Sequence, residues 1–141
     1  MSNQREIAEK KMNPLNDQNT FEKLEALEHE AADFGFKWEN AHQIMDQIKS
    51  ECDEITEHLD STDPKASHML QDEIGDLLHA AFSLCVFYKF NPEETLTKSI
   101  DKFEKRLSNV KKIAKEGGED TLNGKSFDEL MEVWDRAKNM N

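Results

Sequence analysis

Hydrophobic residues recur at three- and four-residue steps along most of the chain, which is the spacing of one face of an α-helix. This pattern predicts helices over residues 21–34, 44–59, 68–89, 92–116 and 127–139. We therefore expect an all-α fold, a helical bundle of about four to five helices that forms a single domain over residues 20–141. The polar segment before it, residues 1–19, is expected to be a flexible N-terminal arm, and Thr20 is expected to cap the first helix.

Two neighbouring helices, the second and third of the series, carry acids close to their apolar positions. In the second helix, Glu51 lies at the edge of an apolar stripe and Glu54 follows one turn later. The helix over residues 68–89 is apolar almost all round, which predicts a buried central helix. Glu73 and Asp76 therefore lie on an element with little surface for water.

The loop between these two helices, residues 60–67, contains a proline and is short enough to make them antiparallel neighbours. This arrangement brings the two pairs of acids opposite each other. A buried carboxylate is very costly unless it protonates, pairs with a base or binds a cation. Neither helix offers Lys or Arg on this face. The acids therefore predict a divalent metal site that suits Mg²⁺ or Mn²⁺, with the ligands Glu51, Glu54, Glu73 and Asp76.

The fourth helix is the basic element of an acidic chain. It begins after an Asn-Pro-Glu-Glu start signal at residues 91–94 and ends at Gly117-Gly118. Lys102 and Arg106 lie one turn apart beside its apolar stripe, where they can hold phosphate oxygens. The alternative is a solvated basic face, and this is the better interpretation for Lys111, Lys112 and Lys115.

Aromatic side chains crowd the break between the first two helices, in the segment FGFKW at residues 34–38. One interpretation is a hydrophobic staple for the following helix. The other is a platform for a nucleobase, since stacking on an aromatic ring contributes about 1–3 kcal/mol per base. In the last helix, Trp134 and Lys138 are one turn apart, and Ser126 with Glu129 forms a capping box.

Composition narrows the classes of partner. The chain has 141 residues, enough for one domain, and its net charge of −12 argues against duplex DNA or an anionic membrane as the main partner. The charge is compatible with metal-bridged binding of an anion, and also with solubility alone. Its two cysteines show neither a disulfide framework nor a zinc spacing. Without a hydrophobic signal core or an apolar run of about 18 residues, a cytoplasmic protein is expected.

The order of these motifs resembles the MazG-type, all-α nucleoside triphosphate pyrophosphohydrolases. The pattern runs Glu51-x-x-Glu54, then Glu73-Ile74-Gly75-Asp76-Leu77-Leu78, then Lys102-Phe103-Glu104-Lys105-Arg106. The family motif is written EExxE followed, after a short loop, by ExxD. The similarity extends from Phe34 to Trp134, about three quarters of the chain. ExxE or ExxD alone is a weak signal, whereas the ordered combination is fairly specific.

The resemblance implies a reaction, a set of site residues and an assembly. The reaction is Mg²⁺-dependent hydrolysis of a nucleoside triphosphate, NTP or dNTP, between the α and β phosphates, giving the monophosphate and pyrophosphate. The implied Mg²⁺ ligands are Glu51, Glu54, Glu73 and Asp76, and the implied substrate contacts are Lys102, Arg106, Trp134 and Lys138. For the mechanism we expect Glu51 or Glu54 to act as the base and Trp38 or Trp134 to stack on the nucleobase. Family members are dimers or higher assemblies, so a homodimer or homotetramer is expected.

Two positions depart from the family pattern. Ser50 stands where the family has the first Glu of EExxE, so any role of a carboxylate at that position is absent. Ile100 stands where some relatives have Asn, which removes a polar contact to sugar or phosphate. The expected metal ligands are all retained, so metal binding is expected to survive.

Two other functions are compatible with parts of the sequence. A di-iron carboxylate bundle places acids among four helices but needs Glu-x-x-His on two of them, and here only Asp76-x-x-His79 approximates that motif. A non-enzymatic acidic helical adaptor or oligomerisation module would explain the charge and the amphipathic helices. It would not explain acids on a helix that is apolar almost all round. An iron-dependent absorption band would favour the first, and no Mg²⁺-dependent stabilisation by nucleotides would favour the second.

Overall fold

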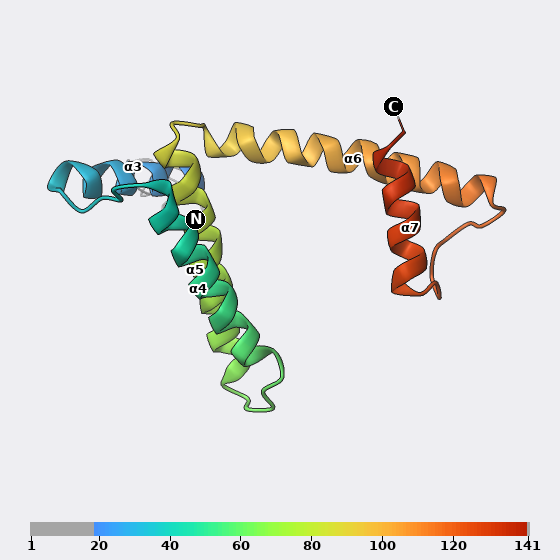
Figure 1. Cartoon of the computed structure of the whole chain (residues 1–141), viewed down its shortest axis with the longest axis horizontal. Coiled ribbons are helices and arrows are strands. Elements are labelled where there is room, and N and C mark those ends of the chain that lie inside the picture. Colours follow the sequence, from blue (N-terminus) through green and yellow to red (C-terminus); the bar gives the residue numbers. More distant parts are fainter. Residues whose placement is uncertain (1–18, 141) are drawn as a thin grey trace, which may run out of the picture. The chain divides into compact units, whose positions relative to one another are not determined.

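The computed structural model describes residues 19–140. In this range the chain forms helices and no strand: α3 (Thr20–Phe34), α4 (Ala41–Leu59), α5 (Ala66–Phe87), α6 (Pro92–Glu116) and α7 (Phe127–Lys138) (Figure 1). The predicted all-α class is confirmed for this part of the chain. Apart from Asn19, the predicted arm over residues 1–19 lies outside the described residues. No described helix combines the length and the apolar character of a membrane span.

Side-chain caps set the start of α3 and of α4. Asn19 Oδ1 accepts a hydrogen bond from Glu22 N at 2.8 Å, so Asn19 caps α3. The prediction of Thr20 as this cap is wrong, because Thr20 is already helical and the residue before it offers an equally good acceptor. Asn40 Oδ1 accepts from Gln43 N at 3.0 Å, which starts α4 earlier than predicted.

The helices α4 and α5 lie side by side as the predicted antiparallel hairpin (Figure 1). In the loop between them, Asp63 Oδ1 accepts a hydrogen bond from Lys65 N at 2.9 Å. Ile44 on α4 is completely buried, and the small residues Ala66 and Ala80 are buried on α5. Small side chains at buried positions allow two helices to approach closely, and this brings the acids of both helices onto neighbouring surfaces.

α3 contacts α5 through a ring pair and a polar cluster. The rings of Phe21 and Phe82 stack with their centroids 6.0 Å apart. Glu28 Oε1 accepts a hydrogen bond from the hydroxyl of Ser83 at 2.5 Å and lies 2.8 Å from Nε2 of His79. Ser83 is buried, whereas α3 itself has no buried residue. α3 is therefore held by a few side chains rather than by a core of its own.

α5 is central among α3, α4 and α5, since it contacts both of the others, but the prediction that it is buried is wrong for the described chain. Several of its large apolar side chains are exposed, among them Leu78 at 67% and Ile74 at 43%. An antiparallel neighbour covers one side of a helix, so a helix that is apolar all round needs a second surface to cover the rest. Within residues 19–140 these side chains stay uncovered.

The chain divides into two compact units, one ending at Glu93 and one beginning at Glu94. The first contains α3, α4 and α5, and the second contains α7 and nearly all of α6. In the second unit, Asn109 Nδ2 on α6 donates a hydrogen bond to Ala137 O on α7 at 3.1 Å, and both residues are buried. The single domain expected over residues 20–141 stays a prediction.

The predicted ends of α6 and the predicted start of α7 are confirmed. α6 begins at Pro92 and ends just before the glycine pair. Gly118 has a φ of 77°, a backbone conformation that glycine adopts without strain. Ser126 caps α7, because its hydroxyl accepts a hydrogen bond from Glu129 N at 3.2 Å. The apolar stripe of α6 is nevertheless exposed in the described chain, at Leu96, Ile100, Phe103 and Leu107.

Asn109→Ala is expected to destabilise the second unit. The substitution removes a buried hydrogen bond between α6 and α7, a loss of about 1–3 kcal/mol. Urea unfolding measures the loss, and limited proteolysis of α7 locates it. Ser108→Ala, at the exposed neighbouring position, is the control and should change stability by less than about 0.5 kcal/mol. Equal stability of the two variants would show that this hydrogen bond does not hold α7.

Candidate functional site

Glu51 and Glu54 lie one turn apart on α4 in different surroundings. Glu51 is only 6% exposed, although charged side chains are almost never fully buried without a partner. Its Oε1 accepts a hydrogen bond from Gln47 Nε2 at 2.7 Å. Its Oε2 is buried and has no hydrogen-bond partner within residues 19–140. Glu54 is exposed. Within the described chain, one carboxylate oxygen of Glu51 therefore has a hydrogen-bond donor and the other has none.

The surroundings of Glu51 raise the pKa of its carboxyl above the usual 4.5. Burial is the largest cause, because it disfavours the charged form. The neighbouring carboxylates of Glu54 and Asp76 raise the pKa further, while the hydrogen bond from Gln47 lowers it. Glu51 thus stands among carboxylates that come from both helices of the hairpin.

Glu73 on α5 is a second carboxylate with a buried oxygen that lacks a partner. Its side chain is 17% exposed, and Nε2 of His58 on α4 lies 3.1 Å from its Oε1. No hydrogen bond from the described residues reaches its Oε2, which is buried. His58 and Glu73 therefore bridge the two helices of the hairpin and leave one carboxylate oxygen bare.

The four predicted metal ligands all lie on the hairpin, but their side chains are not assembled around a common point. Among the described residues, no three His, Cys, Asp or Glu side chains form a group ready to hold a metal ion. Like charges repel, so carboxylates without a cation between them separate, and Glu73 meets His58 instead. The oxygen donors nevertheless fit a hard divalent cation, since two buried oxygens have no other partner in this part of the chain.

Arg106 and Trp134 form a contact in the second unit. The guanidinium carbon of Arg106 lies 5.8 Å from the centroid of the Trp134 ring, within the range of a cation–π contact. The ring of Phe103 lies 6.1 Å from the same tryptophan ring. Trp134 of α7 is therefore engaged by side chains of α6, and it restricts where the Arg106 guanidinium can lie.

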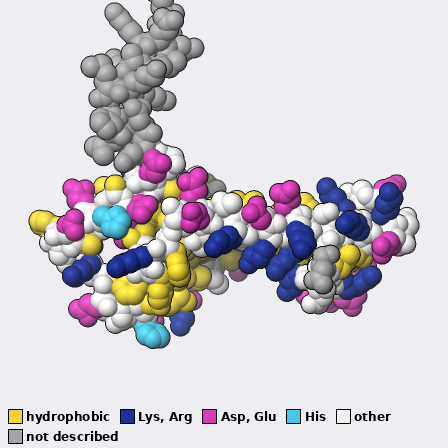
Figure 2. Space-filling view, turned by 90° about the horizontal axis from the view of Figure 1, so that it is seen from above, with side chains coloured by type: hydrophobic (Ala, Val, Ile, Leu, Met, Phe, Trp, Pro, Cys, Tyr) yellow, Lys and Arg dark blue, Asp and Glu magenta, His cyan; other side chains and the backbone are white. Residues whose placement is uncertain are grey.

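The remaining predicted substrate contacts are more exposed. Lys102 is exposed on α6, and Lys138 Nζ lies 3.7 Å from Asp135 Oδ1 on α7. Figure 2 shows Lys and Arg side chains gathered over α6 and α7 on one face. Trp38, between α3 and α4, is 37% exposed. The predicted site residues thus fall into an acidic group with Trp38 in the first unit and a basic group in the second.

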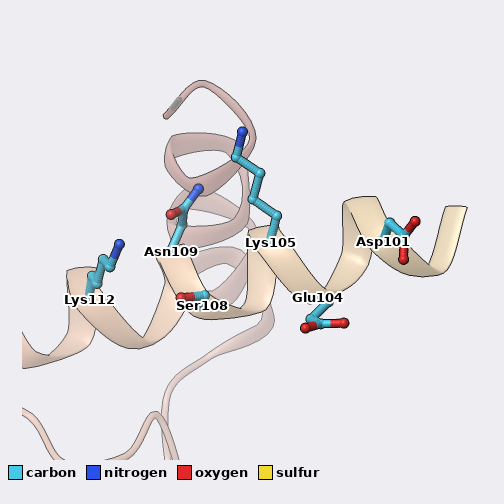
Figure 3. Close-up of a pocket in the computed structure, with 6 residues that line it drawn as sticks. All are labelled: Asp101, Glu104, Lys105, Ser108, Asn109 and Lys112. Atoms are coloured by element: carbon cyan, nitrogen blue, oxygen red, sulfur yellow. The ribbon is translucent and has the colours of Figure 1, made fainter. Parts of the chain in front are cut away.

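A shallow cavity of about 370 Å³ lies along α6, and none of the predicted site residues lines it. Its lining residues are Asp101, Glu104, Lys105, Ser108, Asn109 and Lys112. Figure 3 shows Glu104 and Lys105 pointing to different sides of the helix, so their charges do not converge. The cavity is a depression on a single helix, and we assign it no function.

Gln47 and His58 also belong to this site; the sequence placed both on the flank of Glu54 but did not identify the carboxylates that they contact. Gln47 precedes Glu51 by four residues, a spacing at which side chains on one helix touch, so this contact was readable from the sequence. The contact of His58 with Glu73 depends on the register of the hairpin, which spacing alone does not fix.

Residues 39–111 match the family model of the MazG nucleotide pyrophosphohydrolase domain, slightly more than half of the chain. The chain belongs to the MazG family. The resemblance read from the motifs is therefore confirmed. The MazG match covers the whole hairpin and most of α6, so it includes the four acids as well as Lys102 and Arg106.

Two kinds of curated relative are similar in sequence to parts of this chain. The uncharacterized protein YabN of Bacillus subtilis (strain 168) is 41% identical over 71 residues, which are 50% of this chain and 14% of that protein. The nucleoside triphosphate pyrophosphohydrolases of Escherichia coli strains K12 and O157:H7 are each 28% identical over 117 residues, 82% of this chain and 43% of each relative. The chain therefore spans less than half the length of these relatives.

Glu51→Gln is expected to stabilise the metal-free protein at neutral pH, since glutamine keeps the shape of the side chain and cannot ionise. Because its pKa is raised, the folded protein holds the Glu51 proton more tightly than the unfolded chain does. This contribution is complete below about pH 4.5 and is lost as the pH rises through the folded-state pKa. Each tenfold difference in proton affinity between the folded and the unfolded state changes the free energy of unfolding by about 1.4 kcal/mol.

Urea unfolding in EDTA measures this difference, and the advantage of Glu51→Gln should shrink between neutral pH and about pH 4. Glu57→Gln is the matched control, because Glu57 is exposed on the same helix, and it should change stability by less than about 0.5 kcal/mol. The same gain in both variants would contradict a specific burial cost at Glu51.

Proposed function

We propose that this MazG-family protein hydrolyses a nucleoside triphosphate, NTP or dNTP, between the α and β phosphates and releases the monophosphate and pyrophosphate, with Mg²⁺ as cofactor. Its Escherichia coli relatives carry the name nucleoside triphosphate pyrophosphohydrolase. The observation that carries the proposal is the pair of carboxylates, Glu51 and Glu73, each with a buried oxygen that has no partner in the described chain. Buried charges in proteins are paired or coordinate metals, and oxygen donors favour a hard cation.

The acids of the hairpin supply the proposed metal ligands and the base. Glu51, Glu54, Glu73 and Asp76 would hold Mg²⁺, and Mn²⁺ is a substitute that also accepts oxygen ligands. When bound, such an ion polarises phosphoryl oxygens and lowers the pKa of a coordinated water. Glu54 is exposed beside the buried Glu51, so it is the better placed of the two to accept the proton of the attacking water.

The basic side chains of the second unit would bind the phosphates. Arg106, placed against Trp134, offers a forked donor that matches phosphate oxygens, and Lys102 one turn earlier adds a point charge. Together with Lys138 they offset the charge that develops on the departing pyrophosphate. Because the ring of Trp134 already contacts Arg106, we assign stacking on the nucleobase to Trp38.

Glu54→Gln and Asp76→Asn are each expected to lower turnover about 100-fold or more, because each removes a charged oxygen donor from the proposed site. The assay supplies Mg²⁺ with mixed NTPs or dNTPs and separates pyrophosphate from orthophosphate. Wild type should release pyrophosphate. Circular dichroism should show unchanged helix content in both variants.

Matched controls change the same chemistry at exposed positions of the same helices. Glu57→Gln on α4 and Asp72→Asn on α5 should keep turnover close to that of wild type. Release of orthophosphate by wild type would contradict cleavage at the α–β bond. Wild-type rates in both Glu54→Gln and Asp76→Asn would remove the proposed site.

The exposed apolar faces support a homodimer or homotetramer as the active form. Leu78 on α5 is 67% exposed, and Ile100 and Phe103 on α6 are exposed at 52% and 57%. Contiguous exposed apolar surface marks interaction sites in soluble proteins. A second copy of the chain is the proposed partner, so that the open side of α5 is covered in the assembly. The amphipathic helices, which also favoured an oligomerisation module, are explained by this assembly.

Leu78→Glu is expected to dissociate this assembly, since it places a charge in the proposed contact and leaves the helix intact. Light scattering after size-exclusion chromatography measures the mass of the particle. Thr62→Glu adds a negative charge at an exposed position in the loop between α4 and α5 and should keep the wild-type mass. A monomeric wild type would contradict the proposed assembly.

The contacts of His79 argue against the alternative function as a di-iron carboxylate bundle. It requires a Glu-x-x-His pair around the metal, and Asp76 with His79 approximates that pair. Nε2 of His79 lies 2.8 Å from Glu28 on α3. The imidazole is therefore already engaged by a carboxylate outside the proposed ligand set.

A further inference from the structure

Glu51 and Glu73 of the hairpin each have one buried carboxylate oxygen, and they share a pattern of contacts. In Glu51, Oε1 is held by Gln47 Nε2 at 2.7 Å, and Oε2 is buried without a partner in the described chain. In Glu73, Oε1 lies 3.1 Å from His58 Nε2, and Oε2 is likewise buried and without a partner within residues 19–140. Each carboxylate thus has one oxygen in contact with a neighbouring nitrogen and one oxygen left bare.

We propose that Gln47 and His58 are positioning residues, which fix Glu51 and Glu73 so that the bare oxygen of each is presented to a divalent cation. This inference rests on the proposed function, because it assigns a role toward the same metal. Neither residue is proposed as a metal ligand or as a catalytic residue. Each acts through the carboxylate that it touches.

A contact at one carboxylate oxygen can strengthen metal binding because it limits the rotational freedom of the glutamate side chain. A free glutamate rotates about three bonds, and holding it in one orientation for a metal costs conformational entropy. A contact at one oxygen restricts that rotation before the metal arrives. Partners that hold metal ligands in this way typically change metal affinity about 10–100-fold when they are removed.

The two contacts restrict different parts of the structure. Gln47 and Glu51 lie one turn apart on α4, so their hydrogen bond fixes a side chain on its own helix. His58 on α4 reaches Glu73 on α5, so this contact also fixes one helix of the hairpin against the other.

The remaining two predicted ligands differ from this pair. Glu54 and Asp76 are exposed, so water can satisfy their oxygens in the absence of a metal. Glu51 and Glu73 are therefore oriented before a metal binds, whereas the side chains of Glu54 and Asp76 remain free to move. This division predicts that losing a donor at Gln47 or His58 weakens metal binding before any nucleotide is present.

The test titrates nucleotide-free protein with Mn²⁺ alone and reads the free ion by electron paramagnetic resonance. Gln47→Met and His58→Leu remove the donors and keep apolar bulk in their place. Both are expected to raise the dissociation constant for Mn²⁺ about 10–100-fold. Gln71→Met and His68→Leu make the same changes at exposed positions of α5 and should leave that constant unchanged. His58→Gln restores an amide donor and should recover most of the lost affinity.

A thermal melt of the metal-free proteins separates positioning from a merely structural role. A structural role would lower the melting temperature of Gln47→Met and His58→Leu and leave their Mn²⁺ affinity as in wild type, and this result overturns the inference. Equal losses of affinity in His58→Leu and His58→Gln also overturn it for His58. If His58→Leu loses its helical circular dichroism, Gln47→Met decides the outcome, since Gln47 is an exposed residue whose replacement spares the core.

The result also separates this inference from the proposed function. Wild type that binds Mn²⁺, together with variants that bind it equally well, overturns the positioning role and leaves the metal site standing. Wild type that binds no Mn²⁺ overturns the metal site itself, and the positioning role falls with it.

Discussion

The hairpin of α4 and α5 carries carboxylates into its interface without a lysine or arginine to neutralise them. Glu51 is buried among the charges of Glu54 and Asp76, and its pKa is raised in consequence. Such an arrangement lowers the stability of the fold, and proteins keep destabilising buried charges where those charges are needed for function. In this chain the buried carboxylate that lowers stability is also a proposed metal ligand, so a substitution that removes the buried charge also removes a ligand.

The helices and their hairpin were predictable from the sequence because their signals are local. Three- and four-residue spacing, the Ser126 cap and the glycine pair after α6 each depend on a few neighbouring residues. The cap of α3 was misassigned, since Asn19 and Thr20 are adjacent and both are good acceptors. The burial of α5 was also misassigned. An apolar pattern predicts that Leu78 packs against another surface, but it does not show whether that surface belongs to the same chain or to a second one.

The placement of the four predicted acids on one hairpin was predictable, and their contacts were less so. Helical spacing placed all four acids on facing sides of one hairpin, and the effect of Asp76 on Glu51 agrees with this. Spacing did not indicate that Glu73 meets His58, because that contact depends on how far one helix slides along the other. Likewise, Trp134 was paired with Lys138 by its position along α7, whereas the structure sets it against Arg106 of another helix.

The polar cluster of Glu28, His79 and Ser83 has a consequence for the order in which the fold loosens. α3 has no buried residue, so the Phe21–Phe82 stack and the contacts with Glu28 are what oppose its opening. Amide hydrogens of α3 would then exchange with solvent by a subglobal fluctuation while the hairpin stays protected. Trp38 lies in the loop between α3 and α4, so the ring proposed to stack on the nucleobase is joined to a helix that has no buried residue.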